Sequence, residues 1–180
     1  TGAVERVLIG TSEIAFNDAS ADYDFRVESN NNANMIFVDG GSDHVNIGTA
    51  TDHGAVFNVE TNDNLDTIKL ISTDADANVG PSLVLYRNSS SPADNDYIGK
   101  TTYVGRNDNS QDVNFVTIIS QAIDVSDGTE DGTFIINTMR AGASDQTFNI
   151  TPTEVIINED SKDVDFRVES NGNANMLFVD

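Results

Sequence analysis

The sequence contains no cysteine and no tryptophan, and it has only three prolines in 180 residues. Without cysteine the chain cannot form a disulfide scaffold, a thiolate zinc site or a thiol nucleophile. No apolar run approaches the roughly 18 residues that span a bilayer, and no charged start followed by an apolar core indicates a signal peptide. We therefore expect the fold to be stabilised by burial and backbone pairing alone, with no membrane insertion.

Basic residues are also scarce, because 9 Lys and Arg stand against 30 Asp and Glu and give a formal net charge of -21. A charge of this sign repels nucleic acid phosphates and anionic lipid head groups. Neither is expected as a partner. The abundance of Asp and Asn suits a protein that stays soluble in saline water, where a short Debye length screens self-repulsion.

One long repeat is present in the chain. Residues 13–39 match residues 154–180 at an offset of 141 positions, with 18 identities in 27. Because the sequence begins with Thr1 and ends inside the second copy, we expect the full-length protein to continue at both ends. The residues that follow Asp180 are expected to begin with two glycines, as those after Asp39 do.

Short segments with alternating apolar and polar residues are separated by turns rich in Asn, Asp and Gly, which is the pattern of half-buried strands. These segments are residues 25–27, 45–47, 57–59, 68–70, 148–150 and 166–168. Longer strands are expected at residues 98–104, 115–124 and 133–140. Runs that are apolar at successive positions, and are therefore expected to be covered on both faces, are residues 35–38, 83–86, 118–119 and 134–136.

These patterns predict an all-β protein in which residues 1–60 form a thin β-repeat segment, residues 61–150 an antiparallel β module, and residues 151–180 the start of a second thin segment. A single chain of this kind would leave strand edges and apolar faces open, which soluble proteins avoid. Three copies wound together would close them. The predicted fold is thus an elongated intertwined homotrimeric fibre, with thin triple-stranded β segments on both sides of a globular antiparallel β module.

Three stretches of the sequence resemble structural proteins of tailed bacteriophages. The stretch HVNIGTATDHGAVFNVETND (His44 to Asp63) resembles an element that recurs in tail-fibre shafts, with Asp52-His53 where a proline is common. The block from Asp96 to Asn158, with YIGKTTYVGRND, DGTEDGTFIINTMRAG and FNITPTEVIIN, is similar to a β module of marine phage fibres and tail spikes, including those of cyanobacterial phages. The DFRVESN repeat resembles the same group.

The resemblance implies a homotrimeric fibre on a virion, hence an extracellular location, with other tail proteins as partners. It further implies a receptor-binding tip or a self-cleaving chaperone domain outside these residues, through which host polysaccharide or protein would be contacted. The expected function is a shaft that positions such a tip for host attachment. Two alternatives stay open: a tail spike that cleaves polysaccharide, and a bacterial extracellular filament or adhesin.

No enzyme, cofactor or metal site is expected in this chain. Carboxylates are so abundant that a pair at glycosidase spacing carries no information, and few aromatic residues lie outside the expected strands to raise a carboxyl pKa. No serine lies in a nucleophile elbow, and no glycine-rich loop with a lysine could hold a phosphate.

The best metal candidate is the alternate spacing of Asp74, Asp76 and Asn78, which resembles the first half of a calcium loop. It departs from that pattern at Gly80 and at Leu85, where a closing Glu would stand, so an acidic surface turn is the preferred interpretation. The stretch Gly40 to Asp43 resembles part of a calcium-binding nonapeptide and is read as a simple turn.

Histidine, tyrosine and arginine provide the remaining candidates. His44 and His53 are nine residues apart and match no zinc pattern. If Val45 and Ile47 face inward, His44 and Asn46 face outward. On a three-fold axis, one His44 from each of three chains could then form a ring of three metal ligands. Tyr86, Tyr97 and Tyr103 could form a sugar-stacking platform, although cross-strand packing is the more common role. The pairs Arg26/Glu28 and Arg167/Glu169 share a strand face in both copies of the repeat, and we expect them to link neighbouring chains.

Overall fold

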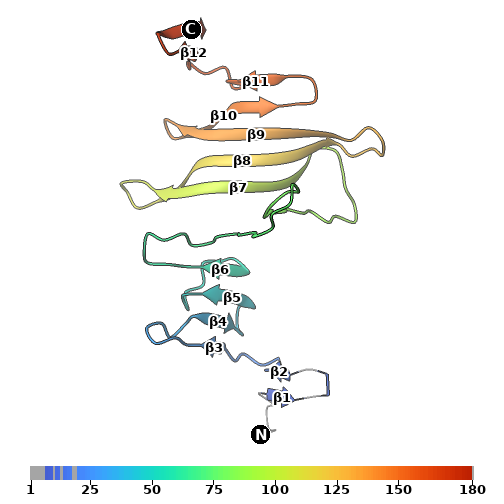
Figure 1. Cartoon of the computed structure of the whole chain (residues 1–180), viewed down its shortest axis with the longest axis vertical. Helices are drawn as coiled ribbons and strands as arrows, with labels where there is room; N and C mark the ends of the chain where they lie inside the picture. The colour runs from blue at the N-terminus through green and yellow to red at the C-terminus, as the bar shows by residue number, and fades with distance from the viewer. Residues whose placement is uncertain (1–6, 10, 13, 18–19, 180) are drawn as a thin grey trace. The chain divides into compact units, whose positions relative to one another are not determined.

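The computed structural model describes residues 7–9, 11–12, 14–17 and 20–179 (Figure 1). Within these residues every regular element is a β-strand, which confirms the expected all-β class with several antiparallel sheets. The described part of the chain contains no helix long and apolar enough to cross a membrane. The chain divides into two compact units, one up to Ser82 and one from Leu83 onward, and each is described by itself.

The first unit contains a hairpin and a small sheet. Strands β1 (Val7–Ile9) and β2 (Ile14–Phe16) pair antiparallel. The four-stranded sheet follows sequence order, with strands β3 (Phe25–Val27), β4 (Ile36–Asp39), β5 (His44–Ile47) and β6 (Phe57–Val59). The pairs β3–β4 and β4–β5 are antiparallel, whereas β5–β6 is parallel. The strands are short, and the turns that connect them are rich in Asn, Asp and Gly, which tolerate the backbone of tight turns.

The second unit is built on a five-stranded antiparallel sheet in the order β11-β10-β9-β8-β7 (Figure 1). Its strands are β7 (Asp96–Arg106), β8 (Asp112–Asp124), β9 (Asp131–Arg140), β10 (Ala143–Ile150) and β11 (Val155–Ile157). The hairpin of β12 (Phe166–Ser170) and β13 (Asn173–Val179) follows. The expected division of the chain at residues 60 and 150 stays a prediction.

The sequence repeat is also a structural repeat. In β3–β4 Phe25 pairs with Val38, and in β12–β13 Phe166 pairs with Val179, so both positions are shifted by the same 141 residues. The equivalence begins before the sequence match: β1 and β2 pair Val7 with Phe16, and β10 and β11 pair Phe148 with Ile157. Strand β10 therefore belongs both to the five-stranded sheet and to the second copy of the repeat.

Matching described residues of the turn after β2 and the turn after β11 have the same backbone conformation. Asn17 and Asn158 have φ angles of 60° and 67°, and Ser20 and Ser161 both have 49°. In each copy the Asn side chain accepts a hydrogen bond from the backbone N–H four residues later and donates one to the carbonyl of that residue. A side chain that satisfies both backbone groups fixes the turn locally.

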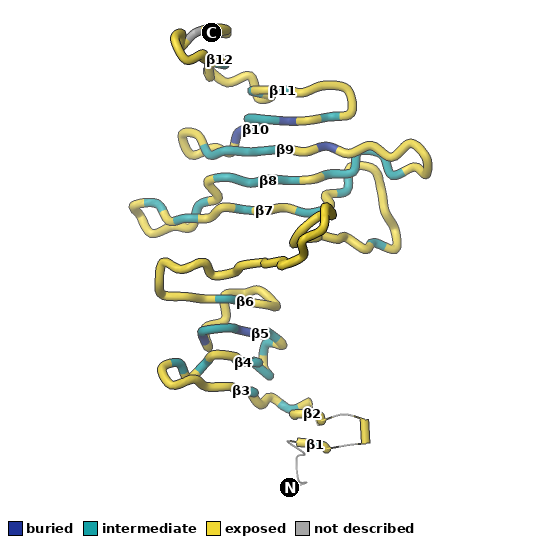
Figure 2. Tube along the Cα trace, viewed as in Figure 1, coloured by how far each residue is buried: buried dark blue, intermediate teal, exposed yellow. Residues whose placement is uncertain are grey.

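Few side chains are buried, as Figure 2 shows, and most of those are polar. Among the described residues Ile135, at 8% exposure, is the one large apolar side chain in the buried class. The buried polar side chains are those of Asn46, Thr49, Asn58, Thr133, Asp145 and Asn149. A single chain thus has very little apolar core.

Several expectations about apolar segments are wrong for the single chain. Residues 68–70 and 83–86 belong to no strand, and their large apolar side chains are exposed. Met35, Ile36 and Phe134, which were expected to be covered on both faces, are also exposed. Residues 68–70 and 83–86 pair with no strand in the described part of the chain, which leaves their apolar side chains open.

Candidate functional site: the β5–β6 crossover and neighbouring polar clusters

The connection between the parallel strands β5 and β6 is unusually short. Parallel neighbours normally need a crossover of a dozen or more residues, often a helix. Here residues 48–56 make the connection without a helix. Gly48 allows the close approach, because its φ is +85° and a Cβ at this position would lie 2.3 Å from the carbonyl oxygen of Glu60.

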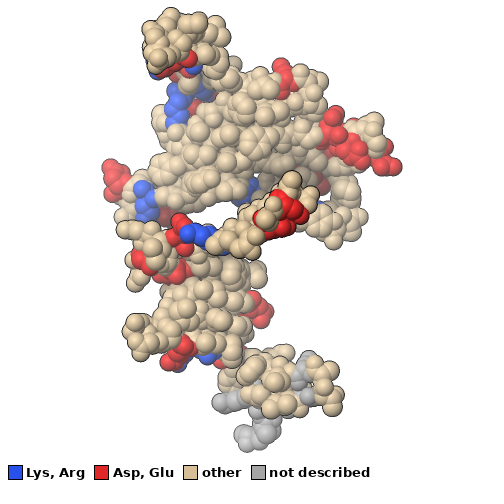
Figure 3. Space-filling model, in the orientation of Figure 1, with Lys and Arg blue, Asp and Glu red and all other residues tan. Residues whose placement is uncertain are grey.

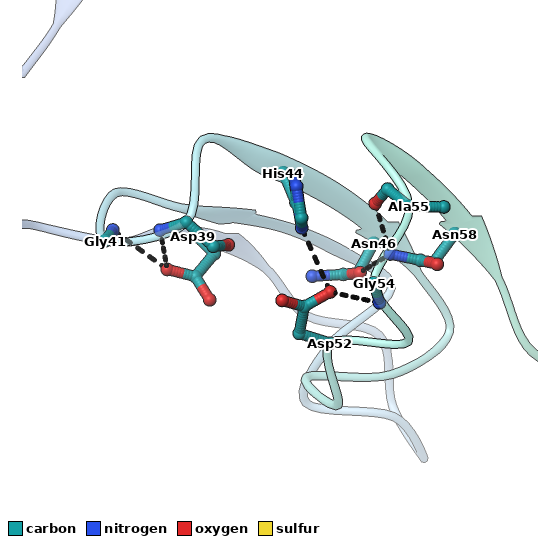
Figure 4. A network of polar contacts seen from close by, with 9 residues as sticks. Asp39, Gly41, His44, Asn46, Asp52, Gly54, Ala55 and Asn58 are labelled. Carbon is teal, nitrogen blue, oxygen red and sulfur yellow. Dashed lines mark hydrogen bonds and ion pairs between the residues drawn. The ribbon is translucent and has the colours of Figure 1, made fainter.

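The polar face of β5 and β6 is turned inward, beneath this crossover (Figure 4). Asn46 is fully buried, and its Oδ1 accepts a 2.7 Å hydrogen bond from Nδ2 of Asn58, which also donates to the carbonyl of Ala55 at 2.8 Å. Phe57, in contrast, is 58% exposed. The expectation that Asn46 faces outward is therefore wrong, because the returning crossover covers the asparagine face of the sheet.

Both histidines of the chain pair with carboxylates of this crossover region. His44 Nδ1 lies 3.0 Å from Asp52 Oδ1, and His53 Nε2 lies 2.9 Å from Glu60 Oε2. The bond from His53 is the main cause that holds the pKa of Glu60 below its usual range. For Asp52 the backbone N–H of Gly54 lowers the pKa most, and His44 adds to it. Within one chain, the two histidine–carboxylate pairs thus join the β5–β6 connection to β5 and to Glu60, which directly follows β6. A ring of three His44 side chains on a three-fold axis stays a prediction.

The candidate calcium loop forms a series of short turns. The N–H of Asp76 donates to Asp74 Oδ1 at 3.3 Å, and the N–H of Asn78 donates to Asp76 Oδ1 at 2.8 Å. The hydrogen bond from the Asn78 N–H is the largest cause that lowers the pKa of Asp76. In the described part of the chain no group of three or more His, Asp or Glu side chains is placed to hold a metal ion. All three side chains are exposed, and the acidic surface turn stays a prediction.

The three candidate tyrosines do not share one face of the sheet. Residues directly opposite each other in an antiparallel pair point to the same side. A register shift after Tyr97 pairs this residue with Gln121, whereas Tyr103 pairs with Val116. Gln121 and Val116 lie on opposite sides of β8 because their positions differ by an odd number. A single stacking platform that includes both Tyr97 and Tyr103 is not formed.

The arginine–glutamate pairs of the repeat form within each hairpin. Arg26 Nη2 lies 2.6 Å from Glu28 Oε1, and Arg167 pairs with Glu169 in the same way. All four side chains are about half exposed. Exposed pairs of this kind contribute little to stability, on the order of 1 kcal/mol or less. A role between chains stays a prediction.

Asp145 is a buried charge that the sequence pattern did not single out. Its Oδ2 accepts a 2.7 Å hydrogen bond from Arg140 Nε, and its Oδ1 lies 3.7 Å from Lys162 Nζ. Lys162 belongs to the repeat turn and stands where the first copy has Ala21. The second copy is therefore joined to the five-stranded sheet by an ion pair that the first copy cannot form. Comparison of the two copies could have indicated this difference.

No family model, no curated protein and no solved structure matches the chain.

Proposed function

We propose that this chain is a structural segment of a tail fibre of a tailed bacteriophage, assembled from three copies. It would hold a receptor-binding tip away from the virion and carry out no chemistry itself. The observation that carries the proposal is the amount of surface that a single chain leaves open, together with the repeat of whole hairpins along the chain.

The exposed surface is far larger than that of a self-sufficient protein. The chain exposes 13911 Å². A compact monomer of 19.3 kDa would expose about 8,500 Å², and two separate compact halves about 10,200 Å² together. The excess, on the order of 3,700 Å² even against two separate halves, includes many large apolar side chains in both units. Surface of this kind is typical of chains that complete their core by association.

The repeat supports a role in spacing. Equivalent hairpins recur at 141 residues with the same register, and the second copy continues directly from a strand of the five-stranded sheet. Reuse of one unit along a chain suits a protein whose task is to cover distance. The resemblance of the same segments to phage fibre shafts points to the same task on a virion.

The association state tests the structural part of the proposal. Light scattering coupled to size exclusion should give about three times the 19.3 kDa mass of the chain. The assembly should persist on dilution, since open apolar faces become its core. A stable, folded monomer would contradict the proposal.

The location needs a separate test. Antibodies raised against the chain should label the tail fibres of intact particles of the source phage in electron micrographs. Labelling of cell-surface filaments in the absence of phage would instead support the filament alternative.

A further inference from the structure

One face of the five-stranded sheet has no charged side chain in its middle. The ladder register places one set of residues on a common face, since directly paired residues point to the same side. We call this the uncharged face; its residues are Thr101, Tyr103, Val116, Ile118, Ser120, Phe134, Ile136, Thr138, Phe148, Ile150, Val155 and Ile157. None of these twelve is an Asp, Glu, Lys or Arg, although 22% of the chain is charged; the register places Asp96, Arg140 and Asp145 on the same side, toward the strand ends.

Apart from Lys100, which lies within β7 on the opposite face, the charged residues of the sheet lie toward the strand ends. Arg106 pairs with Asp112 at one end of the β7–β8 pair, and Asp124 lies opposite Asp131 at one end of the β8–β9 pair. Asp145, which is paired with Thr138, is buried and neutralised by Arg140 and Lys162. Figure 3 shows the acidic side chains around the sheet gathered at its hairpin ends. The middle of the uncharged face is therefore an apolar surface framed by charge.

The uncharged face is also the more open of the two. Tyr103, Phe134, Ile150, Val155 and Ile157 are between 40% and 61% exposed. The buried side chains near the centre of the sheet, Thr133, Ile135 and Asn149, belong to the opposite face. A sheet face with exposed apolar side chains is normally covered by another layer. Among its described residues, the second unit has no such layer over Tyr103, Phe134, Ile150, Val155 and Ile157.

The segment Leu83–Tyr86 lies against this face at Gly99 of β7. A Cβ on Gly99 would lie 3.1 Å from the Cβ of Leu85, and Gly99 pairs with Ser120 of the uncharged face. Arg87 fixes the segment by donating to the carbonyl of Tyr97 at 2.8 Å and by pairing with Asp96 at 3.0 Å. Residues 77–93 contain no Asp or Glu. The segment thus adds exposed apolar side chains without adding negative charge.

We infer that the uncharged face, together with Leu83–Tyr86, is the surface through which copies of this chain meet. In each assembly the uncharged faces of three copies pack against one another and form a shared apolar core. The inference rests on the proposed trimer and adds which surface makes it.

Charge identifies a second copy as the occupant. Two chains that each carry a net charge of -21 repel one another except where their contacting surfaces lack carboxylates. The middle of the uncharged face meets that condition, and its exposed apolar side chains distinguish it from the opposite face. Area agrees, because the excess exposed surface of about 3,700 Å² exceeds the roughly 800 Å² that one partner gives to a standard interface, and a trimer needs two such contacts for each chain.

Adjacent threonines of β7 provide a matched test. Thr101 lies on the uncharged face opposite Ile118, and Thr102 lies on the other face opposite Thr117. Thr101→Glu and Thr102→Glu add the same charge at neighbouring positions of one strand. We expect Thr101→Glu to weaken trimer association by about tenfold or more, because three carboxylates would enter the shared core. Thr102→Glu should leave the association constant nearly unchanged.

A cross-linking experiment removes the ambiguity of a variant that fails to fold. The chain has no cysteine, so a single Ser120→Cys places one thiol per copy on the uncharged face. Under oxidising conditions it should yield disulfide-linked dimers, whereas Thr102→Cys should not. Folding of each variant is checked by circular dichroism.

The outcomes separate the two proposals. A wild-type trimer that tolerates Thr101→Glu and does not cross-link through Ser120→Cys would overturn the choice of face and leave the trimer intact. A wild-type monomer would overturn both. Preferential cross-linking through Thr102→Cys would place the opposite face in the interface and also overturn the inference.

Discussion

Asn58 donates its side-chain N–H to Oδ1 of the fully buried Asn46, 2.7 Å away, and so joins β5 and β6 across their inward face. The two residues are directly paired in the parallel register. Where an apolar core would be expected, this part of the chain has a pair of amides. Its stability therefore depends on hydrogen bonds that can be removed one at a time.

Replacement of Asn58 by alanine should destabilise the β5–β6 pair. The substitution leaves Asn46 Oδ1 without its donor, beside an Nδ2 that is already buried without a partner. An unsatisfied buried polar group costs about 1–3 kcal/mol. Amide hydrogen exchange of residues 45–47 and 57–59 should increase accordingly. Asn62→Ala, at an exposed position of the following turn, is the control and should change exchange little.

The histidine–carboxylate pairs predict a specific response to pH. Asp52 and Glu60 have pKa values below their usual range, so they stabilise the folded state above the usual carboxyl pKa, and this stabilisation is lost as the pH falls through the lowered values. The crossover should accordingly open in acid, below about pH 4. NMR titration of the carboxyl carbons measures this directly.

Two substitutions separate the causes of these shifts. His53→Gln should raise the pKa of Glu60 clearly, because His53 is the main cause of its depression. His44→Asn should raise the pKa of Asp52 less, because the N–H of Gly54 still holds it down. Equal rises at both carboxyls would contradict this assignment.

Gly48 and Gly54 form a matched pair in the same crossover. Both have positive φ angles, but a Cβ on Gly48 would lie 2.3 Å from the carbonyl oxygen of Glu60, whereas a Cβ on Gly54 would meet nothing within 4 Å. Gly54→Ala should cost only the left-handed backbone strain, roughly 1–2 kcal/mol. Gly48→Ala should cost more, since strain and collision add. Denaturant unfolding gives both values, and a smaller cost for Gly48→Ala would show that the close approach is not required.

Arg140 and Arg106 allow a test of the buried charge. Arg140 pairs with Asp145, whose side chain is buried, and Arg106 pairs with Asp112, which is exposed. Arg140→Ala leaves Asp145 with only Lys162 at 3.7 Å and should cost about 1–3 kcal/mol. Arg106→Ala should cost under about 1 kcal/mol. Thermal or denaturant unfolding of the two variants is the measurement.

The sequence predicted most strands of this chain but not which faces they bury. Alternation located β3, β5, β6, β8, β9 and β12, because the two-residue period of side chains is a local property. It misplaced Asn46, because the face that is covered depends on a crossover whose path no local pattern encodes. Residues 68–70 and 83–86 have the composition of strands, yet strand formation also needs a partner, and the single chain supplies none.

The structural repeat begins earlier in the chain than the sequence match. The match begins at Glu154, whereas the equivalent hairpin begins at Phe148. Val7-Leu8-Ile9 and Phe148-Asn149-Ile150 occupy the same ladder positions, and the side chains differ at the first two of the three. Backbone pairing tolerates such replacements, so the structural unit is longer than the identical text.

The common shift of 141 residues has a consequence for inheritance. A recombination event between the two copies of the repeat would add or remove one unit and still pair Phe25 or Phe166 with its usual partner. The strands on both sides of the recombination point would keep the partners and the turns that they have in the present chain. Recombination within the matching text would therefore change the length of the gene in steps of one unit while it preserves the ladder register of the hairpin.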